Sequence, residues 1–178
     1  DDHTRHRTGA VIHPACGMDA VATTDGLSTV PLAVAVVQVG LRPFKGARAF
    51  PLESLVAADS ALHQGSISAD ALEEAVALHA SHPGIRAVRE LLAGADGRHE
   101  SVGETRLGVA LRLLGYETEP QERRTVGVTT YRLDQRIVGT RVVVEFDGIM
   151  KYLPVSPGPD DLSRARRVLE AEKTRQDQ

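Results

Sequence analysis

The chain has 178 residues and a formal net charge of -3, with one cysteine, three phenylalanines, three tyrosines and no tryptophan. This length suits one large domain or two small ones. The single Cys16 excludes an internal disulfide and a cysteine-rich zinc site. The scarcity of aromatic side chains argues against a stacking platform for single-stranded nucleic acid. Because the net charge is negative, any nucleic-acid binding must come from a local basic patch.

Nothing in the sequence predicts a membrane span. The longest apolar run, Val30–Leu41, is too short to cross a bilayer and is interrupted by Gln38. No signal-peptide pattern opens the chain, and its start at Asp1 rather than Met suggests that the numbering begins inside a longer chain. Together with the single cysteine, these features predict a cytoplasmic protein without a membrane partner.

The beginning of the chain predicts a small β element followed by a helix. Short β-like pieces occupy residues 10–13 and 20–24, and Asp25-Gly26 is a hairpin turn signal. Pro31 stands where a helix would begin, and the apolar run after it ends at Gly40.

Residues 40–50 predict a loop, and the apolar spacing after it predicts three short helices in succession. The helices are expected at 52–64, after the N-cap Ser68, and from Pro83-Gly84 to Gly94. We expect a domain boundary near 94–99, which divides the chain into modules 1–97 and 98–178.

The second module predicts the order helix, strand, strand, helix. A helix opens at Ser101 and ends at Gly115, after which the apolar period changes from that of a helix to two. The expected strands are 125–134 and 138–147, and a charged helix follows from Asp160. The predicted fold is therefore mixed α/β, with a small β-plus-helical N-terminal module before this second module.

The two expected strands should pair in a defined register. Gly139-Thr140 suits a two-residue type II′ turn, in which Gly comes first. Such a turn fixes which residues face each other across the hairpin. The predicted pairs are Val138 with Arg141, Arg136 with Val143, and Asp134 with Glu145.

Alternation along the strands sorts the hairpin into two faces. The predicted core face carries Tyr131, Leu133, Ile137, Val142, Val144 and Phe146. The other face carries charges, acidic toward the open end and basic toward the turn, with Val138 and Val143 among them. Its charged residues are Arg132, Asp134, Arg136, Arg141, Glu145 and Asp147.

The pair Asp134 and Glu145 has two interpretations. Carboxylates directly opposite each other, with Cβ atoms about 5 Å apart, repel unless a cation lies between them. Mg²⁺ commonly takes one or two carboxylates, several waters and phosphate oxygens. Alternatively, the pair belongs to a solvated sheet face on which Arg132 and Arg136 balance the acids.

The residues of this hairpin resemble the core of the PD-(D/E)XK nuclease superfamily. The string "VVVEFDGIMKY", the upstream "YRLD", the helix "SVGETRLGVALRLLG" and the final "LEAEKTR" are similar to actinobacterial proteins with a domain related to very-short-patch-repair endonucleases. The segments "GAVIHP", "TTDGLSTVP" and "LVAADSALHQG" resemble the AbiEi-type antitoxin-like segment that precedes this domain in those proteins. The resemblance implies a PD-(D/E)XK-like core and a DNA endonuclease that uses Mg²⁺ or Mn²⁺.

Carried over to this chain, the resemblance implies roles for individual residues. Asp134 and Glu145 become metal ligands, and we group Asp147 with them although the superfamily has Lys at that position. Glu104 becomes a further acidic contributor, and Lys151 becomes the cation near the attacked phosphate.

The residues expected to contact DNA are Arg132, Arg136 and Lys173. For Lys173, a solvated helix face is the alternative. Lys151 could equally be an ordinary solvated lysine after a turn. Glu104 could be the N3 residue of a capping box that begins at Ser101.

Three functions remain open from the sequence, and one of them is an interaction or assembly subunit that uses the helical layer. The leading hypothesis is metal-dependent cleavage of DNA. The alternative is a non-catalytic antitoxin-type regulatory or binding protein that keeps the nuclease fold and acts through a cognate protein partner.

Overall fold

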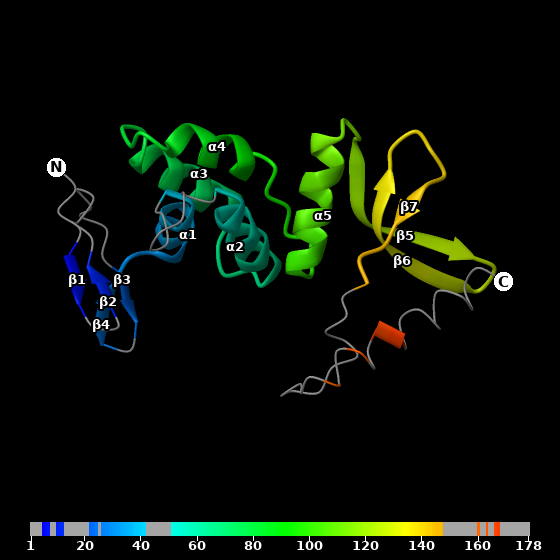
Figure 1. The fold of residues 1–178 in the computed structure, drawn as a ribbon, viewed down its shortest axis with the longest axis horizontal. Helices are drawn as coiled ribbons and strands as arrows, with labels where there is room; N and C mark the ends of the chain where they lie inside the picture. Colours follow the sequence, from blue (N-terminus) through cyan, green and yellow to red (C-terminus); the bar gives the residue numbers. More distant parts are fainter. Residues whose placement is uncertain are drawn as a thin grey trace. The chain divides into compact units, whose positions relative to one another are not determined.

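Helices α1 to α5 and strands β1 to β7 give the protein a mixed α/β fold (Figure 1), which confirms the predicted fold class. The structure is a computed structural model, and it describes residues 5–7, 10–12, 22–24, 26–41, 51–147, 160, 163, 166 and 167. In these described ranges, every helix is too short or too polar to cross a membrane. Asp160, Ser163, Arg166 and Arg167 are helical and exposed, within the range expected for the last helix.

The chain divides into two units, Asp1–Arg106 and Leu107–Gln178. The division falls inside α5 (Val102–Leu113), about two turns after the boundary expected from the sequence.

The first unit begins with two small antiparallel hairpins. One pairs β1 (Arg5–Arg7) with β2 (Ala10–Ile12), and the other pairs β3 (Ala22–Thr24) with β4 (Leu27–Thr29). Gly26 has a φ of +76°, which suits its place in the turn between β3 and β4. The second hairpin confirms the predicted turn, whereas β1 was not predicted.

The helices follow in the predicted order, and their ends follow local rules. Ser68 caps α3 by accepting a hydrogen bond from the N–H of Ala71 at 3.1 Å. Gly65, with a φ of +64°, follows α2, and the N–H groups of Gly65 and Ser66 donate to carbonyls of the last turn. The bounds are α1 Leu32–Leu41, α2 Pro51–His63, α3 Ala69–Leu78 and α4 Ile85–Leu92.

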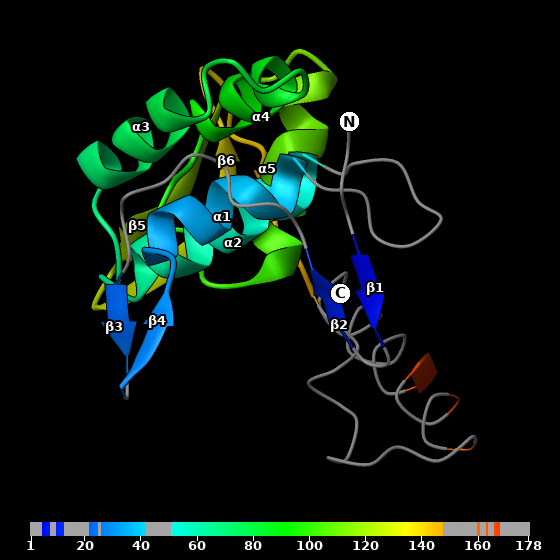
Figure 2. The ribbon, with the colours of Figure 1, turned by 90° about the vertical axis from the view of Figure 1, so that its left-hand side faces the viewer.

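The core of the first unit lies where α1 packs against α2, α3 and α4 (Figure 2). Val37, Ala58 and Val88 are completely buried in it. Gly40 allows the close approach, because a Cβ atom there would lie 2.7 Å from Cβ of Ser54 and 2.9 Å from Cγ2 of Val88. Small residues therefore set the spacing of this core.

A buried polar network fixes the segment after α4. Oδ2 of Asp59 accepts hydrogen bonds from Nδ1 of His99 at 2.7 Å and from Oγ1 of Thr105 at 2.8 Å. Oδ1 of Asp59 accepts from the N–H of Asp96 at 2.8 Å. Because Asp59 is only 1% exposed, these three bonds compensate for removing its carboxylate from water.

The second unit is built on one antiparallel sheet in the order β5-β6-β7. Strand β5 (Thr118–Val126) pairs with β6 (Thr129–Ile137), which pairs with β7 (Val143–Val144). The predicted single strand 125–134 is therefore wrong. It is broken by a two-residue turn at Gly127-Val128, where Gly127 has a φ of +62°. In this turn Gly comes first, which is the arrangement that was predicted for Gly139-Thr140.

The register between β6 and β7 agrees with the prediction, but the turn does not. Arg136 pairs with Val143 as expected. The last pair is Ile137 with Val142, and the turn closes with a 3.2 Å hydrogen bond from the N–H of Thr140 to the carbonyl of Ile137. Val138 does not close the hairpin, because its N–H donates to the carbonyl of Glu117 at the β5 side.

The predicted core face of the sheet is only partly buried. Leu133, Ile137 and Val144 are half-buried, and Gln135 on the same face is completely buried. The remaining three residues of the predicted face are exposed. They are Tyr131 at 53%, Val142 at 50% and Phe146 at 42%.

Candidate functional site

The predicted acidic pair lies where β6 meets the end of β7. The ladder pairs Gln135 with Val144, and the next residues outward are Asp134 of β6 and Glu145, which directly follows β7. Oδ2 of Asp134 accepts a hydrogen bond from the backbone N–H of Phe146 at 2.8 Å. This bond ties Asp134 to the segment that carries Glu145, because Phe146 directly follows Glu145.

Two arginines of the neighbouring β5–β6 hairpin lie near Asp134 in the register of the sheet. Arg123 of β5 and Arg132 of β6 face each other directly in the ladder, and both are exposed. Arg132 shares its side of β6 with Asp134, two residues along the strand. Like charges directly opposite each other are destabilising in a sheet, so an anion between them would be favoured. Arg132 was predicted from the sequence but Arg123 was not, because residues 125–134 were predicted to form one strand rather than parts of β5 and β6.

The backbone opposite Asp134 is unusual. The ladder pairs Pro120 with Gln135 and Glu122 with Leu133, so Gln121 lies across from Asp134. Gln121 has a φ of +56°, in the left-handed region that residues other than Gly rarely adopt. Such conformations cost about 1–3 kcal/mol and cluster at functional sites. The strain therefore coincides with the position of the acidic pair.

Arg136 has acidic partners on the neighbouring strand. Its NH2 lies 2.9 Å from Oε2 of Glu119, and its Nε is paired with Glu122. Glu122 also accepts from Nε of Arg124 at 3.1 Å. Since the Arg136 side chain is only 18% exposed, its charge is largely neutralised within the sheet. DNA contact by Arg136 stays a prediction, and the geometry gives this residue a role in holding β5 to β6.

Glu104 forms the capping interaction that was the alternative to a catalytic role. Oε1 of Glu104 accepts from Oγ of Ser101 at 2.9 Å, and Oε2 accepts from the N–H of Glu100 at 3.0 Å. The N–H of Glu104 donates back to Oγ of Ser101 at 3.2 Å. Both carboxylate oxygens of this buried residue are thus used at the start of α5.

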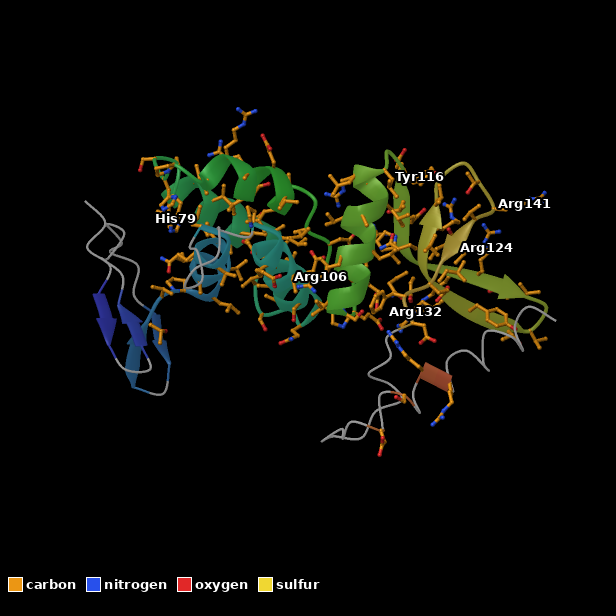
Figure 3. All side chains as sticks on the ribbon, in the orientation of Figure 1. His79, Arg106, Tyr116, Arg124, Arg132 and Arg141 are labelled. Carbon is orange, nitrogen blue, oxygen red and sulfur yellow. The ribbon has the colours of Figure 1, made fainter. Side chains whose placement is uncertain are left out.

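The other predicted site residues do not gather around Asp134. In the described part of the chain, no three His, Cys, Asp or Glu side chains are grouped to hold a metal ion, so half-buried Asp147 does not complete a three-ligand set. Lys151 and Lys173 lie outside the described residues. Arg141 projects from the loop after β6, whereas Arg124 and Arg132 come from the β5–β6 hairpin (Figure 3).

A surface hollow of about 430 Å³ lies at the junction of α5 and β5, and it contains none of the predicted site residues. Its lining residues are Arg112, Gly115, Tyr116, Glu117 and Thr118.

Comparison with known proteins identifies no relative. No protein-family model matches the chain, and neither a curated protein nor a solved structure matches it.

Proposed function

We propose that the second unit is a metal-dependent DNA endonuclease whose site is centred on Asp134 and Glu145. The observation that carries this proposal is the register of β6 and β7, which brings these two residues to adjacent positions beyond the Gln135–Val144 pair. The neighbouring Arg123–Arg132 pair supports it, because guanidinium groups bind phosphate oxygens through paired hydrogen bonds.

The donor set fits a hard divalent ion. Two carboxylates with several waters and substrate oxygens are a common coordination for Mg²⁺, and Mn²⁺ accepts the same ligands. The hydrogen bond from the N–H of Phe146 orients the Asp134 carboxylate, as neighbouring donors commonly do for metal-binding carboxylates. Asp134 and Glu145 would hold the ion, with Asp147 as a further candidate ligand. When bound, the ion would supply an activated water and stabilise charge on the phosphoryl group.

The remaining assignments follow from the resemblance in the sequence. Lys151 would stabilise negative charge at the attacked phosphate, while Arg132, Arg136 and Lys173 would contact the DNA backbone. Glu104 would act only indirectly, by fixing the start of α5. In this proposal the second unit has a PD-(D/E)XK-type core, the first unit is an AbiEi-like module, and the protein works in the cytoplasm.

A second candidate function is a DNA-binding regulator of the antitoxin type without catalysis. The capped state of Glu104 favours it, as does the lack of a three-ligand acidic cluster among the described residues. Such a protein would act through a dedicated protein partner, which a pull-down from the source organism would identify.

A plasmid-nicking assay tests the two candidates. Supercoiled plasmid is incubated with the full chain and Mg²⁺ or Mn²⁺, alongside Asp134→Ala and a control, Glu74→Gln, which changes an exposed residue of α3. The endonuclease proposal expects nicking by the unaltered chain and the control, and none by Asp134→Ala. Equal nicking by all three proteins, or none by any, would exclude the enzyme.

A further inference from the structure

The outer half of the β5–β6 hairpin combines positive charge with an exposed apolar end. Between residues 123 and 132 there are three arginines and no acidic residue, although the whole chain has a net charge of -3. At the end of the hairpin, Val126 is 67% exposed and Val128 is fully exposed. We call the segment Val126–Val128 the tip. Because these apolar side chains are exposed to solvent, burial within the second unit does not stabilise them.

The tip has no side chain that can read bases through hydrogen bonds. Val126, Gly127 and Val128 have no polar side-chain atoms, and the hydroxyls of Thr125 and Thr130 lie 3.0 Å apart and hydrogen-bond each other. Side chains of this kind act on DNA as apolar wedges, which insert between base steps from the minor groove and kink the duplex by about 20–90°.

The spacing along the hairpin matches the depth of that groove. The Arg123–Arg132 pair lies three ladder positions behind the last pair, Val126–Thr129. At about 3.3 Å per residue this is about 10 Å. The minor groove is about 7.5 Å deep. A tip that reaches the floor of the groove would therefore leave the arginine pair at its rim, where the phosphates lie.

We propose that the β5–β6 hairpin is a DNA-binding arm whose tip enters the minor groove of duplex DNA and bends it, while Arg123 and Arg132 contact phosphates on the two sides of the groove. This inference rests on the proposed function for its choice of DNA as the partner, but it does not require cleavage. It predicts little base-sequence preference, because phosphate contacts and apolar wedges carry little sequence information.

The charge contacts are tested by the salt dependence of binding. The full chain is titrated into a fluorescent 20-bp duplex in EDTA, so that no metal-dependent step takes part. Removing two phosphate contacts with Arg123→Gln/Arg132→Gln is expected to reduce the slope of log K against log salt by about 2. The matched control is Arg86→Gln/Arg89→Gln, which removes the same charge from exposed positions of α4 and should leave the slope unchanged. Equal slopes of log K against log salt for the two double variants would contradict the proposal that the hairpin binds DNA.

The wedge is tested by bending. Energy transfer between dyes at the two ends of the duplex should report a bend of about 20–90° with the unaltered chain. Val126→Ser/Val128→Ser should bind with the same salt slope but leave the duplex straight. An equal bend with this variant would overturn the wedge, as would a change from a dimer to a monomer on sedimentation, because the tip would then serve self-association.

Failure of the inference and failure of the proposed function give different results. Asp134→Asn should bind and bend the duplex normally while losing nicking. If no protein nicks plasmid but the arm variants behave as described, the arm stands and the endonuclease proposal falls. If nicking depends on Asp134 but the arm variants bind and bend DNA normally, the arm falls alone.

Discussion

His99 donates a hydrogen bond from Nδ1 to Oδ2 of Asp59 at 2.7 Å, and both side chains are at least 94% buried. The two residues are 40 positions apart in the sequence, so this contact closes a long loop of the first unit. Changing such a buried carboxylate is costly, because it leaves buried polar groups uncompensated.

Replacing Asp59 should therefore destabilise the first unit strongly. Asp59→Asn removes the charge and brings amide hydrogens toward donors, so we expect the free energy of unfolding to fall by about 3 kcal/mol. Urea denaturation measures this change in the free energy of unfolding. The exposed control Glu74→Gln should change it by less than about 0.5 kcal/mol. A fall for Asp59→Asn no larger than that of the control would show that the network contributes nothing.

Local signals in the sequence were enough to predict the helices. Ser68, Gly65 and Gly115 end or begin helices through bonds to residues only three or four positions away. The β6–β7 register was also predictable, because a short connection leaves few alternatives. The acidic pair could be located from the sequence for the same reason.

The missed features depend on contacts between distant segments. Gly127 lies in a continuous run of strand-forming residues, so the sequence suggested one strand where the structure has two, and the Arg123–Arg132 pair was lost with it. The partner of Val138 is Glu117, which directly precedes β5, and a prediction from the β6–β7 hairpin alone could not include it. The Asp59–His99 pair has no local signal at all.

Arg136 should be important for the sheet of the second unit. Arg136→Gln removes the cation that pairs with both Glu119 and Glu122 of β5, and we expect the free energy of unfolding to fall by about 1–3 kcal/mol. The control Arg124→Gln removes an arginine whose side chain is 57% exposed and should cost less than about 1 kcal/mol. Chemical denaturation followed by circular dichroism measures both. Equal losses would contradict the role assigned to Arg136.

Gly40 should not tolerate a side chain. Gly40→Ala places a methyl group 2.7 Å from Cβ of Ser54, so α1 must move away from α2. We expect a loss of about 1–3 kcal/mol, in spite of the better helix propensity of alanine. The melting temperature from thermal unfolding measures this loss. A melting temperature equal to or above that of the unaltered chain would mean that α1 and α2 are not packed this closely.

Asp96 should make stability depend on acid pH. Burial disfavours the charged form of Asp96, but hydrogen bonds from the side chain and backbone of Arg98, with the charges of Arg98 and His99, outweigh it and hold the pKa below the ordinary value of 3.8. A group with a lowered pKa stabilises the fold above its unfolded pKa, and this contribution is lost as the pH falls through the folded pKa.

Asp96→Asn should therefore remove part of the acid sensitivity. The free energy of unfolding of the variant should fall less steeply than that of the unaltered chain as the pH drops below about 3.8. Denaturation curves between pH 6 and pH 2, at intervals of about half a unit, measure the slopes. Parallel slopes for the two proteins would rule out a contribution from Asp96.

Metal binding by the pair Asp134 and Glu145 is the central claim, and isothermal titration calorimetry of the full chain with Mn²⁺ tests it directly. Asp134→Asn keeps a side-chain oxygen that can accept from the N–H of Phe146. The variant therefore removes the negative charge but can keep this hydrogen bond. We expect one binding event with the unaltered chain and with Glu74→Gln, and an affinity more than about 100-fold weaker with Asp134→Asn or Glu145→Gln, since outer-shell changes alone commonly cost 10–100-fold. Equal affinity for all four proteins, or no binding by any, would contradict the assignment.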